Sequence, residues 1–142
     1  MLNPVIHRWK LYLRPSHLPL IKGLQLPSLP SAVSSVDIIL AEFLGYIKDC
    51  IQEFVTTSYG GGPLIWTTLY PQMHLILTTP NGWEGAQQQR MRTAAHKAGL
   101  VGQNGGQRVH FVTEAEVSLL YYLAILHREI DGLNTGRVSV CR

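Results

Sequence analysis

The spacing of apolar and polar positions changes along the chain and divides it into segments. From Ser34 to Val55 apolar residues recur at steps of three and four, which predicts an amphipathic helix. Ser34 is expected to cap this helix, and Asp37 to accept hydrogen bonds from the free amides of its first turn. The expected apolar face consists of Val36, Leu40, Phe43, Leu44, Ile47, Ile51 and Phe54.

The period changes after three consecutive glycines, Gly60 to Gly62, which are expected to end the helix. Residues 74–79 contain an uninterrupted apolar run, which predicts a strand buried on both faces of a sheet. Residues 80–85 then form a turn. Residues 86–98 are predicted to be helical, with Gly99 as the stop.

A second cycle of strand and helix follows a loop rich in Gly and Asn. Residues 108–112 are predicted to form a strand, and Thr113 with Glu116 forms a T-x-x-E capping box at the start of a helix that runs to about His127. Residues 131–136 are expected to turn and residues 137–141 to form a third strand. This order of helices and strands predicts the α/β class with a layered sheet built from βαβ units.

The first 33 residues differ from the rest. They hold five prolines, and they carry basic residues before any acidic one occurs. Trp9, Leu11 and Leu13 alternate with polar neighbours, which predicts a short strand. We interpret residues 1–33 as a proline-rich basic arm or a remnant of a peripheral lobe, and residues 34–142 as the folded lobe. An arm that binds RNA or membranes is an alternative, but spread-out charges interrupted by prolines favour a solvated extended arm.

Composition narrows the functional classes. Apolar residues make up 46% of the 142-residue chain and charged residues 15%, below the usual roughly 25%, so we expect another part or partner to cover some of its surface. A net charge of +3 argues against nucleic-acid binding. The chain has no apolar run of about 20 residues and no secretory signal, so a cytoplasmic location is expected. Cys50 falls on the apolar side of the first helix and is expected to be a core residue.

Few motifs carry chemistry. The glycine run follows a helix rather than a strand, so we interpret it as a helix stop and not as a phosphate loop. The six histidines lack zinc-site spacing, and no G-x-S-x-G elbow occurs. Glu114 is different, because it follows a strand at the end where open α/β sheets bind ligands. A carboxylate there could orient a water molecule or hydrated Mg²⁺, although an acid that complements the helix dipole is the simpler reading.

Two segments resemble a known family. Residues 77–100 contain Thr-Thr-Pro, then Trp83, Gln87, Ala94 and a closing Ala-Gly-Leu, and residues 112–122 begin Val-Thr-Glu-Ala-Glu. Both are similar to the nucleotide-binding domain of the heat-shock protein 70 family, where the corresponding segments contain T-V-P-A, Q-R-Q-A and A-G-L, and I-N-E-P-T. Pro-Asn-Gly-Trp-Glu-Gly and Phe-Val-Thr-Glu-Ala-Glu look typical of its divergent twelve-A type and fungal relatives. The resemblance covers most of residues 9–140.

The resemblance implies part of an actin-like ATPase lobe with a ribonuclease-H-like core. The complete family domain binds ATP and Mg²⁺ between two lobes. Pro80 would then occupy a relay position between the nucleotide cleft and the surface, and Glu114 would lie near the metal–phosphate cluster as a catalytic residue.

The chain also departs from the family pattern. Both phosphate loops, D-x-G-T-T and D-x-G-G-G-T, and the catalytic lysine lack a match, and Gln88 replaces the relay arginine. Residues 136–140 resemble the strand that leads into the second loop, so we expect a fragment that has no ATPase activity and binds no cofactor alone. Its expected partner is the missing lobe or a full-length relative, with no role for nucleic acid or membranes. The alternative is a stand-alone interaction module that regulates a full-length relative.

Overall fold

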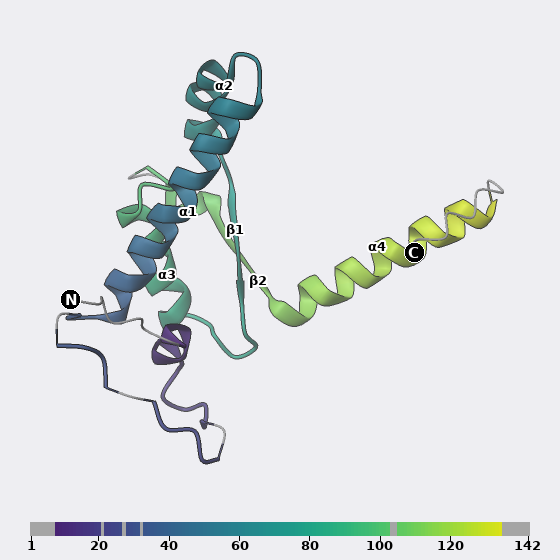
Figure 1. Cartoon of the computed structure of the whole chain (residues 1–142). Helices are drawn as coiled ribbons and strands as arrows, with labels where there is room; N and C mark the ends of the chain where they lie inside the picture. Colours follow the sequence, from purple (N-terminus) through teal and green to yellow (C-terminus); the bar gives the residue numbers. More distant parts are fainter. Residues whose placement is uncertain (1–7, 21, 27, 32, 103–104, 135–142) are drawn as a thin grey trace. The chain divides into compact units, whose positions relative to one another are not determined.

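The computed structural model describes residues 8–134, except 21, 27, 32, 103 and 104. Two compact units are present. The first contains the residues up to Ile76 together with Gly82–His110, and the second contains Leu77–Asn81 together with the residues from Phe111 onward. The elements are mixed α and β, as expected. Figure 1 labels them along the chain.

Helix α1 (Val36–Ser58) organises the first unit. It packs against η1 (Trp9–Leu13), α2 (Gly62–Leu69) and α3 (Ala86–Lys97), and η2 (Tyr70–Gln72) follows α2 directly (Figure 1). A further short turn of 3-10 helix, η3 (Gly105–Arg108), contacts α3. The long helix predicted from the sequence is therefore confirmed as the scaffold on which the other helices of this unit pack.

The contact between α1 and α3 forms much of the described core. Its residues lie on one stripe of each helix, spaced by three or four positions, which places them on a common face. They are Val36, Leu40 and Leu44 from α1 and Met91, Ala94 and Ala95 from α3. The two alanines have almost no exposed area, and such small side chains let two helices approach closely.

Three details of α1 differ from the expectation. Ser35, one residue later than predicted, is the N-cap, and its side chain accepts from the Asp37 amide at 3.1 Å. Phe43, Ile51 and Phe54 are exposed, although the apolar period placed them on the buried face. Cys50 is exposed too and is not a core residue. The apolar stripe of α1 is thus wider than the surface that the described residues cover.

The two strands are β1 (Leu75–Thr79) and β2 (Val109–Thr113), which pair in parallel with α3 between them in the chain. Their position confirms the predicted β–α–β order. The prediction that β1 is buried on both faces is wrong, because Ile76 is 64% exposed and Thr78 is exposed. Successive strand residues point to opposite sheet faces, and the described residues cover one of them.

Two further predictions fail, and one helix was not predicted. Residues 9–13 form a 3-10 helix rather than a strand, because the Leu11 amide bonds the Arg8 carbonyl at 2.9 Å. Helix α2 follows the glycine run without having been predicted. Helix α4 (Glu114–Asn134) continues through most of the predicted turn at 131–136. The strand expected at 137–141 lies outside the described residues.

Candidate site at the carboxyl ends of the two strands

Pro80 and Glu114 follow the two paired strands directly. Pro80 comes after β1, and Glu114 comes after β2 as the first residue of α4. Both residues belong to the second unit. Because parallel strands end at the same edge of a sheet, both residues lie at the edge where α/β sheets bind ligands. The structure therefore brings the two sequence-predicted site residues to one sheet edge.

The start of α4 is fixed by the predicted capping box. The Glu116 carboxylate accepts from the Thr113 amide at 2.6 Å, and the Thr113 hydroxyl accepts from the Glu116 amide at 3.1 Å. The hydrogen bond that the Glu116 carboxylate accepts from the Thr113 amide is the main cause that lowers the pKa of Glu116, and its contact with the Thr113 side chain lowers this pKa further. The cap thus uses Glu116, whereas Glu114 lies exposed in the same first turn.

The turn after Pro80 is held by its aromatic residue. Trp83 is 4% exposed, and the Gln88 side-chain amide donates to the Trp83 carbonyl at 3.3 Å. Gly82 has a φ of 81°, which L side chains rarely adopt, and a Cβ added there would lie 3.3 Å from Leu18 Cδ1. The Gln88 side chain therefore stabilises the loop that joins β1 to α3.

The glycine run has no phosphate-loop geometry. It connects two helices, with Gly61 at a φ of 76° and the Gly62 amide bonded to the Tyr59 carbonyl at 2.9 Å. The interpretation as a helix stop is therefore confirmed.

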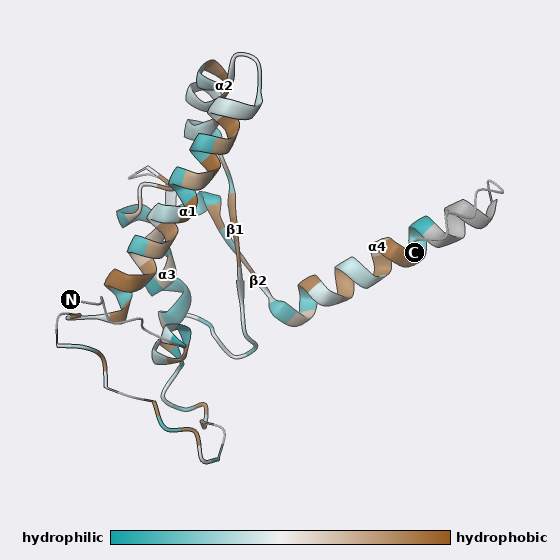
Figure 2. Ribbon diagram, in the orientation of Figure 1, coloured by the Kyte–Doolittle hydropathy of each residue, from teal (hydrophilic) through white to brown (hydrophobic). Residues whose placement is uncertain are grey.

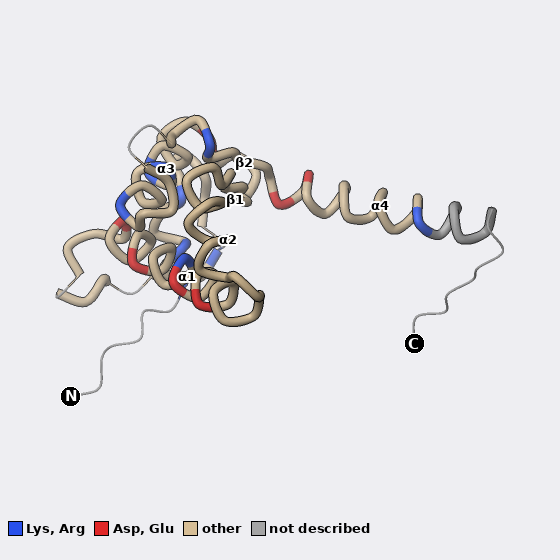
Figure 3. Tube along the Cα trace, turned by 90° about the horizontal axis from the view of Figure 1, so that it is seen from above, with Lys and Arg blue, Asp and Glu red and all other residues tan. Residues whose placement is uncertain are grey.

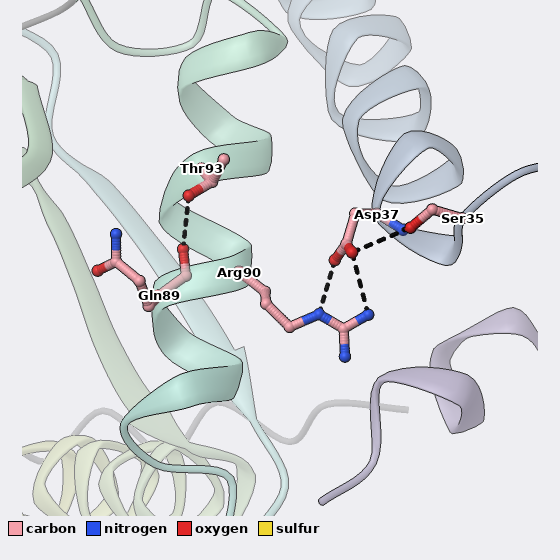
Figure 4. A network of polar contacts seen from close by, with 5 residues as sticks. All are labelled: Ser35, Asp37, Gln89, Arg90 and Thr93. Carbon is pink, nitrogen blue, oxygen red and sulfur yellow. Dashed lines mark hydrogen bonds and ion pairs between the residues drawn. The ribbon is translucent and has the colours of Figure 1, made fainter.

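A polar network joins α1 to α3 (Figure 4). The Arg90 guanidinium donates to both carboxylate oxygens of Asp37, at 2.7 and 3.2 Å, and the Ser35 hydroxyl donates to the same carboxylate at 3.0 Å. The hydrogen bond from Arg90 is the main cause that lowers the pKa of Asp37, and partial burial opposes it. Both side chains are about one-third exposed, so the network orients the helices rather than forming a reactive centre.

A cavity of about 430 Å³ lies beside the end of α3. Its wall is mostly apolar, with two nitrogen-bearing side chains, His96 and Arg108. The guanidinium of Arg108 is already bonded to the Pro71 carbonyl and lies 3.5 Å from the Met73 carbonyl oxygen. This arginine therefore acts first as a link between two backbone segments.

One contact that no sequence motif indicates is a pair of histidines. The Nδ1 atom of His74 lies 2.8 Å from the Nε2 atom of His110, and their ring planes differ by 6°. The two residues are 36 positions apart and share no local motif. Their positions at the starts of two strands that pair in parallel are the signal that could have revealed them.

Comparisons with known proteins identify no relative: no family model, curated protein or solved structure matches the chain. Within the described part of the chain, no group of three or more His, Cys, Asp or Glu side chains is placed to hold a metal ion together, and no helix is long and apolar enough to span a bilayer.

Proposed function

We propose that the chain forms part of the nucleotide-binding lobe of a heat-shock-70-like protein, an ATPase of actin-like fold, and that it does not hydrolyse ATP alone. The main support is the parallel β1–α3–β2 order, with Pro80 and Glu114 at the carboxyl ends of neighbouring strands. The motifs in residues 77–100 and 112–122 fall on these same elements, which gives the resemblance a consistent structural setting.

The proposed roles follow from this position. In the complete domain Glu114 would orient a water molecule or hydrated Mg²⁺ near the phosphates, and Pro80 would relay changes at the cleft to the outer surface. Phosphoryl transfer depends on groups that position and neutralise the phosphates. The sequence lacks both glycine-rich phosphate loops, so the chain alone has few groups that could hold a triphosphate.

Isothermal titration with ATP·Mg²⁺ tests the proposed inactivity. We expect no binding in the micromolar range, with a heat-shock-70-like protein that carries both loops as the positive control. Micromolar binding by this chain would contradict the proposal.

Membership of the larger domain has a separate test, the nucleotide sequence next to the coding region. A downstream segment that encodes D-x-G-G-G-T in any frame supports it, and the lack of one in all frames argues against it.

The second candidate is an interaction module that regulates a full-length relative. Helix α4 favours it, because its described side chains include seven exposed large apolar residues. They are Val117, Leu119, Leu120, Tyr121, Tyr122, Leu123 and Ile125. A pull-down with a full-length relative separates the two functions: a stoichiometric complex supports regulation, whereas aggregation without capture supports an incomplete lobe.

A further inference from the structure

The histidine pair places two ring nitrogens next to each other at the surface. His74 precedes β1 by one residue and His110 is the second residue of β2, so the two rings lie at the starts of two paired strands. Both side chains are exposed and therefore accessible to an ion from solvent. The ring centroids are 5.1 Å apart and the two nearest nitrogens 2.8 Å apart, so the nitrogens face each other between nearly parallel rings.

Arg108 links the two backbone segments that carry His74 and His110. Its guanidinium bonds the Pro71 carbonyl and approaches the Met73 carbonyl at 3.5 Å. This contact ties the residues just before His74 to those just before His110. Strand pairing holds the two segments on the other side of the histidines. Because both backbones are held, an ion that binds the two rings does not have to bring the strands together first.

The nitrogen separation is that of the hydrogen bond between the rings, and its value also matches the spacing of two ligands around one class of metal ion. Imidazole–metal bonds are about 2.0 Å long, so two nitrogens at right angles around one ion lie about 2.8 Å apart. That arrangement is the cis pair of a square-planar or tetragonal ion such as Cu²⁺ or Ni²⁺, and Cu²⁺ binds most tightly in the divalent series. Mg²⁺ and Ca²⁺ require oxygen ligands and do not suit two imidazoles beside an arginine.

We propose that His74 Nδ1 and His110 Nε2 bind one Cu²⁺ ion as cis ligands, with water in the remaining positions. The exposed rings rotate so that both lone pairs point at the ion instead of at each other. The ring that donates the N–H···N bond moves its proton through solvent to its other nitrogen. Two neutral imidazoles then donate one electron pair each, and the coordination step releases no proton and changes no oxidation state.

The test is a Cu²⁺ titration of the full-length chain in a Cys50→Ser, Cys141→Ser background, which removes thiols that would reduce the ion. We expect one tight site whose electron paramagnetic resonance spectrum shows coupling to two nitrogens. His74→Ala or His110→Ala should each lower the affinity by about a hundredfold, because the second bond of a linked pair is lost. Ni²⁺ and Zn²⁺ should bind more weakly.

The matched control is His17→Ala with His96→Ala, which removes the same number of exposed imidazoles from other positions. This control should keep the tight site. Equal Cu²⁺ affinity for the His74→Ala, His110→Ala double variant, or loss of the site in the control, would overturn the proposal. So would a spectrum of the parent chain without two-nitrogen coupling, and this measurement does not depend on whether any histidine variant folds.

Discussion

At the scale of single residues, the pair formed by Asp37 and Arg90 determines how α1 and α3 are joined. Its partners lie 53 positions apart, and the arginine contacts both carboxylate oxygens (Figure 4). A two-point contact between planar groups restricts orientation as well as distance. Asp37 also lies next to the Ser35 cap, so the same carboxylate connects the start of α1 to the side of α3.

A double-mutant cycle measures this pair. Asp37→Asn and Arg90→Gln, alone and combined, should give a coupling free energy of about 0.5 kcal/mol in urea denaturation, because both groups are partly exposed and screened. Asp49→Asn combined with Arg90→Gln is the control, since Asp49 pairs with its neighbour Lys48 at 3.1 Å. A coupling for Asp37 no larger than that of the control would contradict the assigned contact.

Low pH should remove the contribution of the Asp37–Arg90 pair to the free energy of unfolding. Arg90 lowers the pKa of Asp37 in the folded chain, so folding favours the ionised carboxylate. The contribution is complete above the unfolded pKa, near 3.8, and is lost as the pH falls through the lower folded value. We expect the difference in unfolding free energy between the parent chain and Asp37→Asn to be constant from pH 7 to 5 and to shrink below pH 4. A difference that stays unchanged down to pH 2 would contradict the assignment.

At the scale of elements, Gly62 sets the junction between α1 and α2. A Cβ at this position would lie 2.4 Å from the Val55 carbonyl oxygen and 2.6 Å from the Thr56 Cα atom, both backbone atoms. Backbone cannot move aside as the end of a long side chain can. The close return of α2 onto the last turns of α1 therefore depends on the absence of a side chain at Gly62.

Gly62→Ala should lower the unfolding free energy by about 1–3 kcal/mol through overpacking. Gly60→Ala is the matched control, because no atom lies within 4 Å of its added Cβ and its φ is not positive. Thermal unfolding monitored by circular dichroism compares the melting temperatures of the two variants. Equal melting temperatures for both variants would show that α2 does not return onto α1 in this way.

The elements that could be predicted from the sequence are those whose determinants are local. Thr113 and Glu116 satisfy each other within one turn, and Gly99 ends α3 at a φ of 72°, so neither depends on distant residues. The order of β1, α3 and β2 likewise placed Pro80 and Glu114 at one edge. The contacts between Asp37 and Arg90, and between His74 and His110, could not be predicted, because they arise from packing and strand register.

Burial was the least predictable property. The apolar periods of α1 and β1 are real, but whether Phe43 or Ile76 is buried depends on what covers that face. A hydrophobic pattern predicts which face of an element is buried, but it does not identify what packs against that face. The same reasoning explains why Cys50, on the apolar side of α1, is exposed among the described residues.

At the scale of the whole molecule, α4 stands out among the described elements for its exposed large apolar side chains. Figure 2 shows apolar residues along much of the described helix, and Figure 3 shows acidic residues at its start and basic colour further on. Tyr121 is 69% exposed and Leu120 62%. A monomeric soluble protein seldom exposes so many large apolar side chains on one helix, so a lobe of the same domain or a partner is expected to bury them.

The isolated chain should therefore associate through α4. Light scattering coupled to size-exclusion chromatography should give a mass above 15.9 kDa that rises with protein concentration. Leu120→Glu with Leu123→Lys should shift the chain toward a monomer, because charged side chains resist burial without partners. Leu64→Glu on α2, at a position that is 72% exposed, is the control and should change the mass little. A parent chain that stays monomeric at every concentration would show that α4 needs no cover, and it would remove the main support for an interaction module.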